Sequence, residues 1–224
     1  MGYILNLETS TKNCSVSIAQ NGEVVALQEL NSEGYSHAEK LHPFIQKCME
    51  SSGVRFEDID AIAVGKGPGS YTGLRIGVSA AKGLCFAHDI PLLSINSLEI
   101  LARTSEHFDG MIVPMLDARR MEVYSAVFDS NYNWLRETKA EIINSESFLP
   151  LLRQGKVLFL GDGAEKCKEV IQHNNAFFLD DSFPSAQQMA MMSYEKFQKG
   201  LFENVAYFEP FYLKDFIVTP EKKK

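Results

Sequence analysis

A glycine-rich segment is the part of this sequence best suited to bind an anion. Its residues are Gly67, Pro68, Gly69, Ser70, Tyr71, Thr72 and Gly73. It leads into a predicted helix over 72–87, whose first N–H groups and dipole can hold a phosphate. No Gly-Lys-Ser/Thr ending makes it a Walker loop, and the third glycine of a dinucleotide-binding fingerprint is missing. Phosphate binding and close helix-to-sheet packing through Gly69, Gly73 and Gly77 are both consistent with the pattern.

Hydroxyl groups and a lysine follow the first predicted strand. Thr9, Ser10 and Lys12 lie in this turn, where they could face a nucleotide phosphate. The alternative is a hydroxyl-rich hairpin turn without a ligand. The candidate nucleotide or phosphate site therefore comprises Thr9, Ser10, Lys12, Gly67, Gly69, Ser70, Thr72 and Gly73.

The sequence gives little support to covalent or metal-dependent catalysis. Ser70 does not fit a G-x-S-x-G nucleophile, because Pro68 and Thr72 stand where glycines are needed. His37 and His42 lie about 140° apart around a helix, so they do not share one face as two ligands would. The four cysteines form no C-x-x-C pair. We predict no catalytic residue and no metal site.

Composition indicates an ordinary globular chain of one large or two small domains. It has 224 residues, of which 45% are hydrophobic and 23% charged. The net charge of −7 repels a phosphate backbone, so nucleic acid is not expected to bind this chain alone. There is no export signal and no apolar run near the ~18 residues that span a bilayer, which predicts a cytoplasmic protein without membrane contact.

Periodicity and turn signals predict two α/β units that must position these residues. The polar stretch 104–110 separates them, which gives domains 1–105 and 106–224. The first unit is predicted to contain strands over 3–7, 14–19, 24–30, 61–64 and 91–95, and helices over 36–51, 72–87 and 96–105. The second is predicted to contain strands over 111–116, 123–128, 134–142 and 157–160, and helices over 164–173 and 185–199.

Each unit begins with antiparallel strands and continues as alternating helix and strand. This order suggests a duplicated α/β fold of the actin, sugar-kinase and Hsp70 type, with mixed sheets flanked by helices. The alternative is one doubly wound sheet with an antiparallel extension. The helix over 72–87 is apolar nearly all round, so either the core or another subunit must cover its second face.

Four motifs spread over nearly the whole chain resemble the TsaB family. They are Leu-Glu-Thr-Ser-Thr at 7–11, the glycine segment at 65–77, Asp-Ala-Arg-Arg-Met-Glu-Val-Tyr at 117–124 and Pro-Phe-Tyr-Leu-Lys at 210–214. This family supplies a subunit for bacterial tRNA threonylcarbamoyladenosine biosynthesis and was formerly grouped with the M22 glycoprotease-like proteins. The resemblance implies the two-lobed actin-like ATPase fold.

The resemblance also implies a role as a non-catalytic platform. The catalytic partner would be TsaD, which transfers threonylcarbamoyl to the adenosine 3′ of the anticodon in tRNAs that read ANN codons. The ATPase TsaE would join them, and tRNA would be bound only through the complex. This chain would require no cofactor of its own, and ATP or ADP would belong to the complex. The H-x-x-x-H metal pair of TsaD-like proteins aligns with residues 97–101, where Ser97 and Leu101 replace both imidazoles.

The implied pairing surface lies on the helices 36–51 and 72–87. It predicts a heterodimer with TsaD, and a homodimer through the same surface when TsaD is absent. The implied interface residues are Leu41, Ile45, Leu74, Val78, Ala81, Leu84 and Cys85.

Two other functions compete with the platform role. One is a small kinase or ATPase that uses Thr9, Lys12 and the loop 67–73. The other is a glycoprotease, which rests only on the older family name. The sequence leaves open whether Arg119 or Arg120 contacts tRNA, because Asp117 and these arginines also fit a charged hairpin loop held by an Asp–Arg pair.

Overall fold

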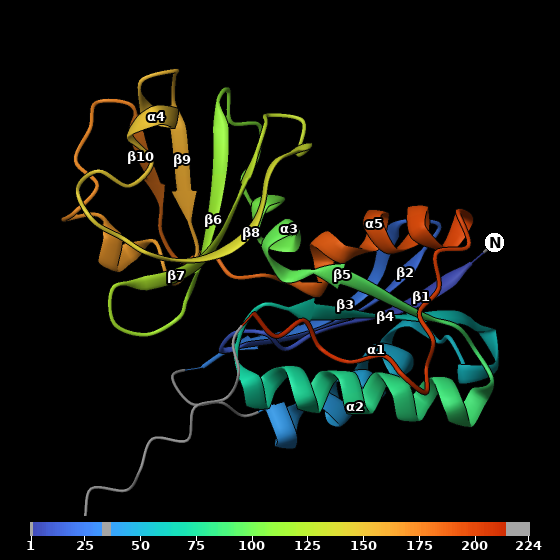
Figure 1. Cartoon of the computed structure of the whole chain (residues 1–224). Helices are drawn as coiled ribbons and strands as arrows, with labels where there is room; N and C mark the ends of the chain where they lie inside the picture. The colour runs from blue at the N-terminus through green and yellow to red at the C-terminus, as the bar shows by residue number, and fades with distance from the viewer. Residues whose placement is uncertain (1, 33–36, 214–224) are drawn as a thin grey trace, which may run out of the picture.

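The first half of the chain builds one mixed five-stranded sheet. The computed structural model describes residues 2–32 and 37–213 (Figure 1). Strands β1 and β2 are antiparallel, as are β2 and β3, whereas β4 and β5 continue from β1 in parallel. The strand order is β3-β2-β1-β4-β5. The strands are β1 (Tyr3–Glu8), β2 (Asn13–Gln20), β3 (Glu23–Asn31), β4 (Ile59–Gly67) and β5 (Leu92–Asn96).

The second sheet repeats this topology. Strands β6, β7 and β8 form an antiparallel meander, and β9 and β10 add in parallel on the other side of β6. Read from β8 to β10, the order is again third, second, first, fourth, fifth. The repetition confirms the predicted duplicated fold, and the single doubly wound sheet is wrong. The strands are β6 (Met111–Asp117), β7 (Glu122–Phe128), β8 (Trp134–Ile142), β9 (Val157–Leu160) and β10 (Ala176–Leu179).

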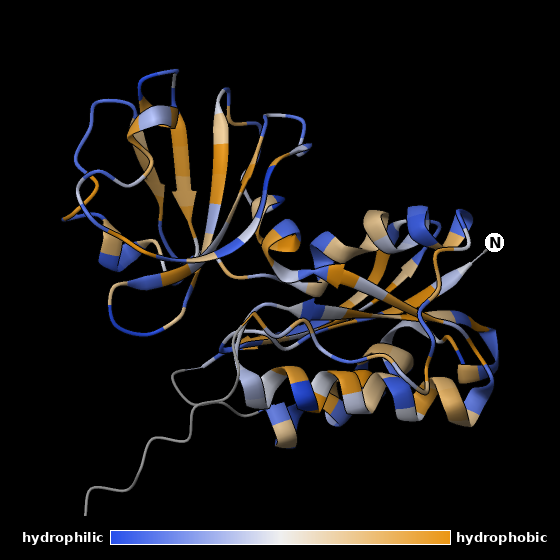
Figure 2. Ribbon diagram, in the orientation of Figure 1, coloured by the Kyte–Doolittle hydropathy of each residue, from blue (hydrophilic) through white to orange (hydrophobic). Residues whose placement is uncertain are grey.

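Helices cover both faces of the first sheet (Figure 1). On one face α1 (His37–Ser52) and α2 (Tyr71–His88) enclose a core with the apolar residues of β1, β2 and β4. On the other face lie α3 (Ser97–Ala102) and α5 (Ala186–Gln198). Helix α3 also packs on β6 and β7, so it connects the two sheets. Figure 2 shows hydrophobic residues concentrated on the strands and on the helix faces that meet them.

Local signals set several element boundaries as predicted. Asn21 and Gly22 have φ values of 52° and 88°, which is the backbone that a two-residue hairpin between β2 and β3 needs. Helix α3 begins after Asn96, whose side chain accepts a hydrogen bond from the N–H of Leu98 at 2.9 Å. The predicted helix start at Ser36 lies outside the described residues.

The helix predicted over 164–173 is wrong. Only the 3₁₀ turn η2 (Glu165–Cys167) forms there, continued by tight turns such as the bond from Val170 N to Cys167 O. Ala164, Cys167 and Ile171 of this segment nevertheless belong to the second core. Strand β10 was not predicted.

The carboxyl-terminal segment returns to the first sheet. Met189 and Met192 of α5 pack against Ile4 and Ala61, so α5 belongs to the first lobe and not to the second unit, where the sequence placed it. Beyond α5 the chain runs along α2, where the Lys82 ammonium donates to the carbonyl of Phe208 at 2.9 Å. The predicted division into 1–105 and 106–224 therefore separates the two sheets but misplaces α5 and the segment after it. None of the described helices is both long and apolar enough to span a bilayer.

Candidate functional site

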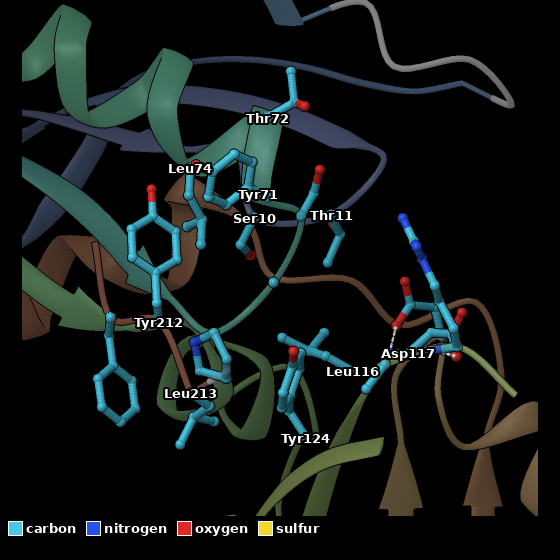
Figure 3. A pocket seen from close by; sticks show the side chains of 17 residues that line it. Ser10, Thr11, Tyr71, Thr72, Leu74, Leu116, Asp117, Tyr124, Tyr212 and Leu213 are labelled. Carbon is cyan, nitrogen blue, oxygen red and sulfur yellow. Dashed lines mark hydrogen bonds between the residues drawn. The ribbon is translucent and has the colours of Figure 1, made fainter. Parts of the chain in front are cut away.

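A cleft of about 600 Å³ lies where the two lobes meet (Figure 3). The first lobe contributes Ser10, Thr11 and the residues around Gly69. The second contributes the β6–β7 turn with Asp117 and Arg119, together with Asp162. Tyr71 and Tyr212, whose ring centroids are 5.2 Å apart, form an aromatic wall of the cleft.

The glycines of the sequence motif permit very close backbone contact beneath this cleft. A Cβ atom at Gly73 would lie 2.1 Å from the carbonyl oxygen of Thr9. At Gly77 it would lie 2.2 Å from the Thr9 hydroxyl, and at Gly69 it would lie 2.3 Å from the carbonyl oxygen of Ser10. The close-packing interpretation therefore explains these three glycines without a ligand, because no side chain fits between the turn and α2.

The amino end of α2 is partly satisfied from within the chain. The N–H of Ser70 donates to the carbonyl of Ser10 at 2.7 Å. The Ser70 hydroxyl accepts from the N–H of Gly73 at 3.3 Å as the helix cap. The backbone N–H groups of Ser70 and Gly73, two of the donors that could bind an anion at the start of α2, therefore already have partners within the protein.

Glu8 is completely buried at the centre of the first lobe. Its carboxylate accepts from the N–H of Ser10 at 2.6 Å and from the hydroxyl of Ser97 at 3.1 Å. The Ser97 hydroxyl also accepts from the N–H of Gly67 at 3.2 Å. Burial raises the pKa of Glu8 above its usual value, and the hydrogen bonds from Ser10 and Ser97 oppose that rise. The network ties β1, the glycine segment and α3 together.

Glu8→Gln is expected to stabilise the protein at neutral pH. Burial favours the protonated carboxyl, so the contribution of Glu8 is fully present below the unfolded pKa near 4.5 and is lost as pH rises through the raised folded pKa. Glutamine keeps an acceptor for Ser10 and carries no charge. Urea unfolding should therefore show a higher free energy for the variant at pH 7.5 and a much smaller difference at pH 4. A lower free energy of unfolding for the variant than for the wild type at pH 7.5 would contradict this account.

Asp162 and Lys166 hold the β6–β7 turn of the second lobe in place. The Asp162 carboxylate accepts from the N–H of Asp117 at 2.9 Å, and burial raises the pKa of Asp162. The Lys166 ammonium pairs with the Asp117 carboxylate and donates to the carbonyls of Arg120 and Glu122, each at 2.6 Å. Asp117 is thus paired with Lys166, and its contact with Arg119 is a 3.0 Å bond from the backbone N–H rather than the predicted ion pair with a guanidinium.

Arg119 and Arg120 occupy left-handed backbone, with φ values of 70° and 50°. This conformation costs a residue other than glycine on the order of 1 kcal/mol. Both side chains are exposed. The hydrogen bonds that the turn makes with Lys166 and Asp162 hold its backbone in this strained left-handed conformation.

The candidate phosphate residues do not all reach the cleft. Ser10, Gly69, Ser70 and Thr72 line it, whereas Gly67 and Gly73 lie buried beneath. Thr9 is buried as well and donates its hydroxyl hydrogen to the carbonyl of Gly73 at 2.8 Å. The ammonium of Lys12 stands 4.8 Å from the ring centroid of Phe183. Sequence reasoning missed Tyr71 and Tyr212, which only folding brings together.

The predicted interface residues are almost all core residues. Helix α1 and helix α2 turn these side chains toward the sheet, where their exposed fractions are 4% or less, so they are not available to a partner in this conformation. Only Leu84 is partly exposed. The core residues are Leu41, Ile45, Leu74, Val78, Ala81 and Cys85.

The face of α2 that points away from the core carries different residues. Arg75, Ser79 and Gly83 are exposed at helical spacing, and Phe86 at the end of this row is 86% exposed, whereas Ile76 and Ala80 are partly buried against the first core. We call this row the outer face of α2. At Gly83, among the described residues, nothing lies within 4 Å of the place that a Cβ atom would take.

Ser97 and Leu101, the positions at which the resemblance predicted two lost histidines, have structural roles. Ser97 joins the Glu8 network, and Leu101 is buried in the core between the lobes. Within the described residues, no group of three or more histidine, cysteine or acidic side chains is arranged to hold a metal ion.

The duplicated sheets and the cleft between them define the two-lobed actin-like ATPase class. The family model described as "TsaD: tRNA N6-adenosine threonylcarbamoyltransferase" matches residues 32–221. The tRNA threonylcarbamoyladenosine biosynthesis protein TsaB of Escherichia coli K12 is 30% identical over 220 residues, which cover 95% of this chain and 94% of that protein. The chain belongs to the TsaB family of tRNA threonylcarbamoyladenosine biosynthesis proteins.

Other relatives agree with this assignment. TsaB of Bacillus subtilis strain 168 is 33% identical over 172 residues, 75% of each chain. The solved structure of YeaZ from Pseudomonas aeruginosa superposes with a TM-score of 0.83 at 26% identity and covers 95% of this chain and 100% of that chain.

Proposed function

We propose that this chain is the non-catalytic platform subunit of a tRNA N6-threonylcarbamoyladenosine synthesis complex. It holds the catalytic subunit TsaD and allows the ATPase TsaE to join, so that threonylcarbamoyl reaches the adenosine 3′ of the anticodon. Membership of the TsaB family and the match to the TsaD family model support the proposal. The single observation that carries the platform role is the outer face of α2.

Gly83 is the most informative residue of that face. A glycine inside a helix costs about 1 kcal/mol relative to alanine, and the described residues offer no steric reason for it here. A glycine lets another helix approach closely, and the exposed Phe86 beside it supplies about 1.5–3 kcal/mol when a partner buries it. The outer face of α2 therefore suits a tightly packed partner helix. A second copy of the chain occupies the same face when TsaD is absent.

The residues at positions 97 and 101 support a chain without catalysis of its own. Ser97 and Leu101 offer no imidazole to a metal. The turn at Thr9 and Ser10 fills part of the α2 amino end, which supports a chain that needs no nucleotide of its own, with ATP or ADP belonging to the complex. Calorimetry at millimolar ATP should detect no binding to the isolated chain. Binding there would favour the alternative of a free-standing kinase or ATPase.

Gly83→Glu is expected to abolish assembly while the fold is kept. The new carboxylate would project into open space in the free chain but would be buried without a partner in the complex. Light scattering of the variant mixed with TsaD should show separate proteins, and tRNA modification by the mixture with TsaE should fall at least tenfold.

The matched control is Gly155→Glu on the second lobe. Gly155 also has open space around its Cβ position among the described residues, so it adds the same charge away from α2. It should assemble like the wild type. The platform role is wrong if modification proceeds at the same rate without this chain, and the assigned face is wrong if Gly83→Glu assembles normally.

A further inference from the structure

The β6–β7 turn presents two arginines that the fold does not use. Among the described residues, neither guanidinium of Arg119 or Arg120 enters an ion pair or a side-chain hydrogen bond. Both are exposed, and Arg119 lines the mouth of the cleft. A turn of this kind more often carries asparagine or glycine, which adopt positive φ readily. Two arginines here serve no packing purpose.

The backbone of the turn is held rigidly enough to aim these side chains. Lys166 contacts the turn at Asp117, Arg120 and Glu122. Gly163 allows its segment to pack closely against the end of β6, because a Cβ atom at Gly163 would lie 2.9 Å from the carbonyl carbon of Leu116. Since Lys166 already neutralises Asp117, that carboxylate does not cancel the charges of the arginines.

A third cation stands on the opposite lobe. The duplicated topology makes the β1–β2 turn, residues 9–12, the counterpart of the β6–β7 turn, residues 118–121. Burial raises the pKa of Asp162, which supports the second turn, and the charge of Lys12 on the first turn opposes that rise. Lys12 does not line the cleft itself, so Arg119 is the basic side chain at the mouth of the cleft, in a chain whose net charge is −7.

We propose that Arg119 and Arg120 bind phosphate groups of the tRNA backbone when the chain is part of its complex. The inference rests on the proposed function, which brings tRNA to this molecule. Guanidinium groups suit phosphate because they offer paired donors in a plane. Backbone contacts of this kind position an RNA without reading its sequence. The net charge of −7 is expected to keep tRNA from binding this chain by itself.

The test uses the assembled complex with TsaD and TsaE and the double variant Arg119→Ala, Arg120→Ala. The affinity for tRNA, measured by filter binding, should fall roughly tenfold. The slope of log affinity against log salt should drop by between about 1.4 and 1.8, because each phosphate contact contributes roughly 0.7 to 0.9. The mass of the complex should be unchanged. ATP binding to the complex, measured by calorimetry, should also be unchanged.

Two further variants separate a ligand role from a structural one. Arg119→Asn with Arg120→Gly removes both charges but suits positive φ, so it should lose tRNA affinity without any fall in melting temperature. The charge-matched control is Arg153→Ala with Lys156→Ala, two exposed positions between helix α4 (Leu149–Leu152) and β9. They lie at the opposite end of the second sheet, because they precede β9 whereas the turn follows the parallel strand β6.

Each other outcome overturns the inference. Equal tRNA affinity of the alanine variant and the control would show that these arginines do not contact RNA. A loss of ATP binding instead would assign the turn to free nucleotide phosphate, and a loss of assembly would assign it to a protein partner. If the wild-type chain fails to join TsaD, the proposed function itself fails. The mass measured for the mixture of wild-type chain and TsaD identifies that case.

Discussion

Ala81→Glu is expected to unfold the chain rather than merely prevent its assembly. Ala81 has no exposed surface and lies between α2 and the first sheet among the residues of the larger core. A glutamate there must either bury an unpaired carboxylate or push α2 off the sheet, which costs several kcal/mol. That is a large part of the 5–15 kcal/mol that typically stabilises a domain. Circular dichroism during thermal unfolding should show a strongly lowered melting temperature, or no cooperative transition.

Gly83→Glu is the internal comparison for this experiment. It adds the same charge two residues along the same helix, but on the outer face of α2. It should retain the wild-type melting temperature within a few degrees. If Ala81→Glu folds normally and fails only in assembly, then α2 turns a different face to the core than the structure shows.

Gly73→Ala is expected to destabilise the protein strongly. The added Cβ would lie 2.1 Å from the backbone carbonyl of Thr9, and a backbone atom cannot move aside as a flexible side chain can. Such overpacking costs about 3 kcal/mol where the backbone must shift. The displacement would also break the bond from the Thr9 hydroxyl to the carbonyl of Gly73. Urea denaturation should report the loss as a lower midpoint.

Gly83→Ala gives the opposite result on the same helix. Its Cβ meets open space among the described residues, so the variant gains helix propensity and should be stabilised by about 0.5–1 kcal/mol. The same methyl group should weaken pairing with TsaD if the outer face of α2 packs closely against a helix. If the two substitutions change stability equally, steric contact at Gly73 is not what requires glycine there.

Most elements were predictable because their signals are local. The Asn21–Gly22 turn, the Asn96 cap and the long apolar periodicity of α2 each act within a few residues. The helix predicted over 164–173 was wrong because that prediction, too, used local signals alone. Its apolar residues fit a helix by spacing alone, but contacts with β6 and β7 through Lys166 favour a 3₁₀ turn.

The candidate site was predictable only in part. The glycine segment and the turn at 9–12 were recognisable as neighbours of strand ends, which is where ligands bind in this class of fold. Tyr71 and Tyr212 could not be paired from sequence, because 140 residues separate them. The residues predicted for a pairing surface on helices 36–51 and 72–87 lie almost entirely on the buried sides of α1 and α2, so a pairing surface on these helices stays a prediction.

By itself the sequence determined the kind of most elements and the repetition of their order. Residue type and short-range spacing suffice for those conclusions. The tertiary structure alone decided that α5 covers the first sheet, that Ala81 faces inward while Gly83 faces outward, and that the arginine turn stands at the cleft. Periodicity shows that a helix has an apolar face, but which surface covers that face depends on contacts between distant segments.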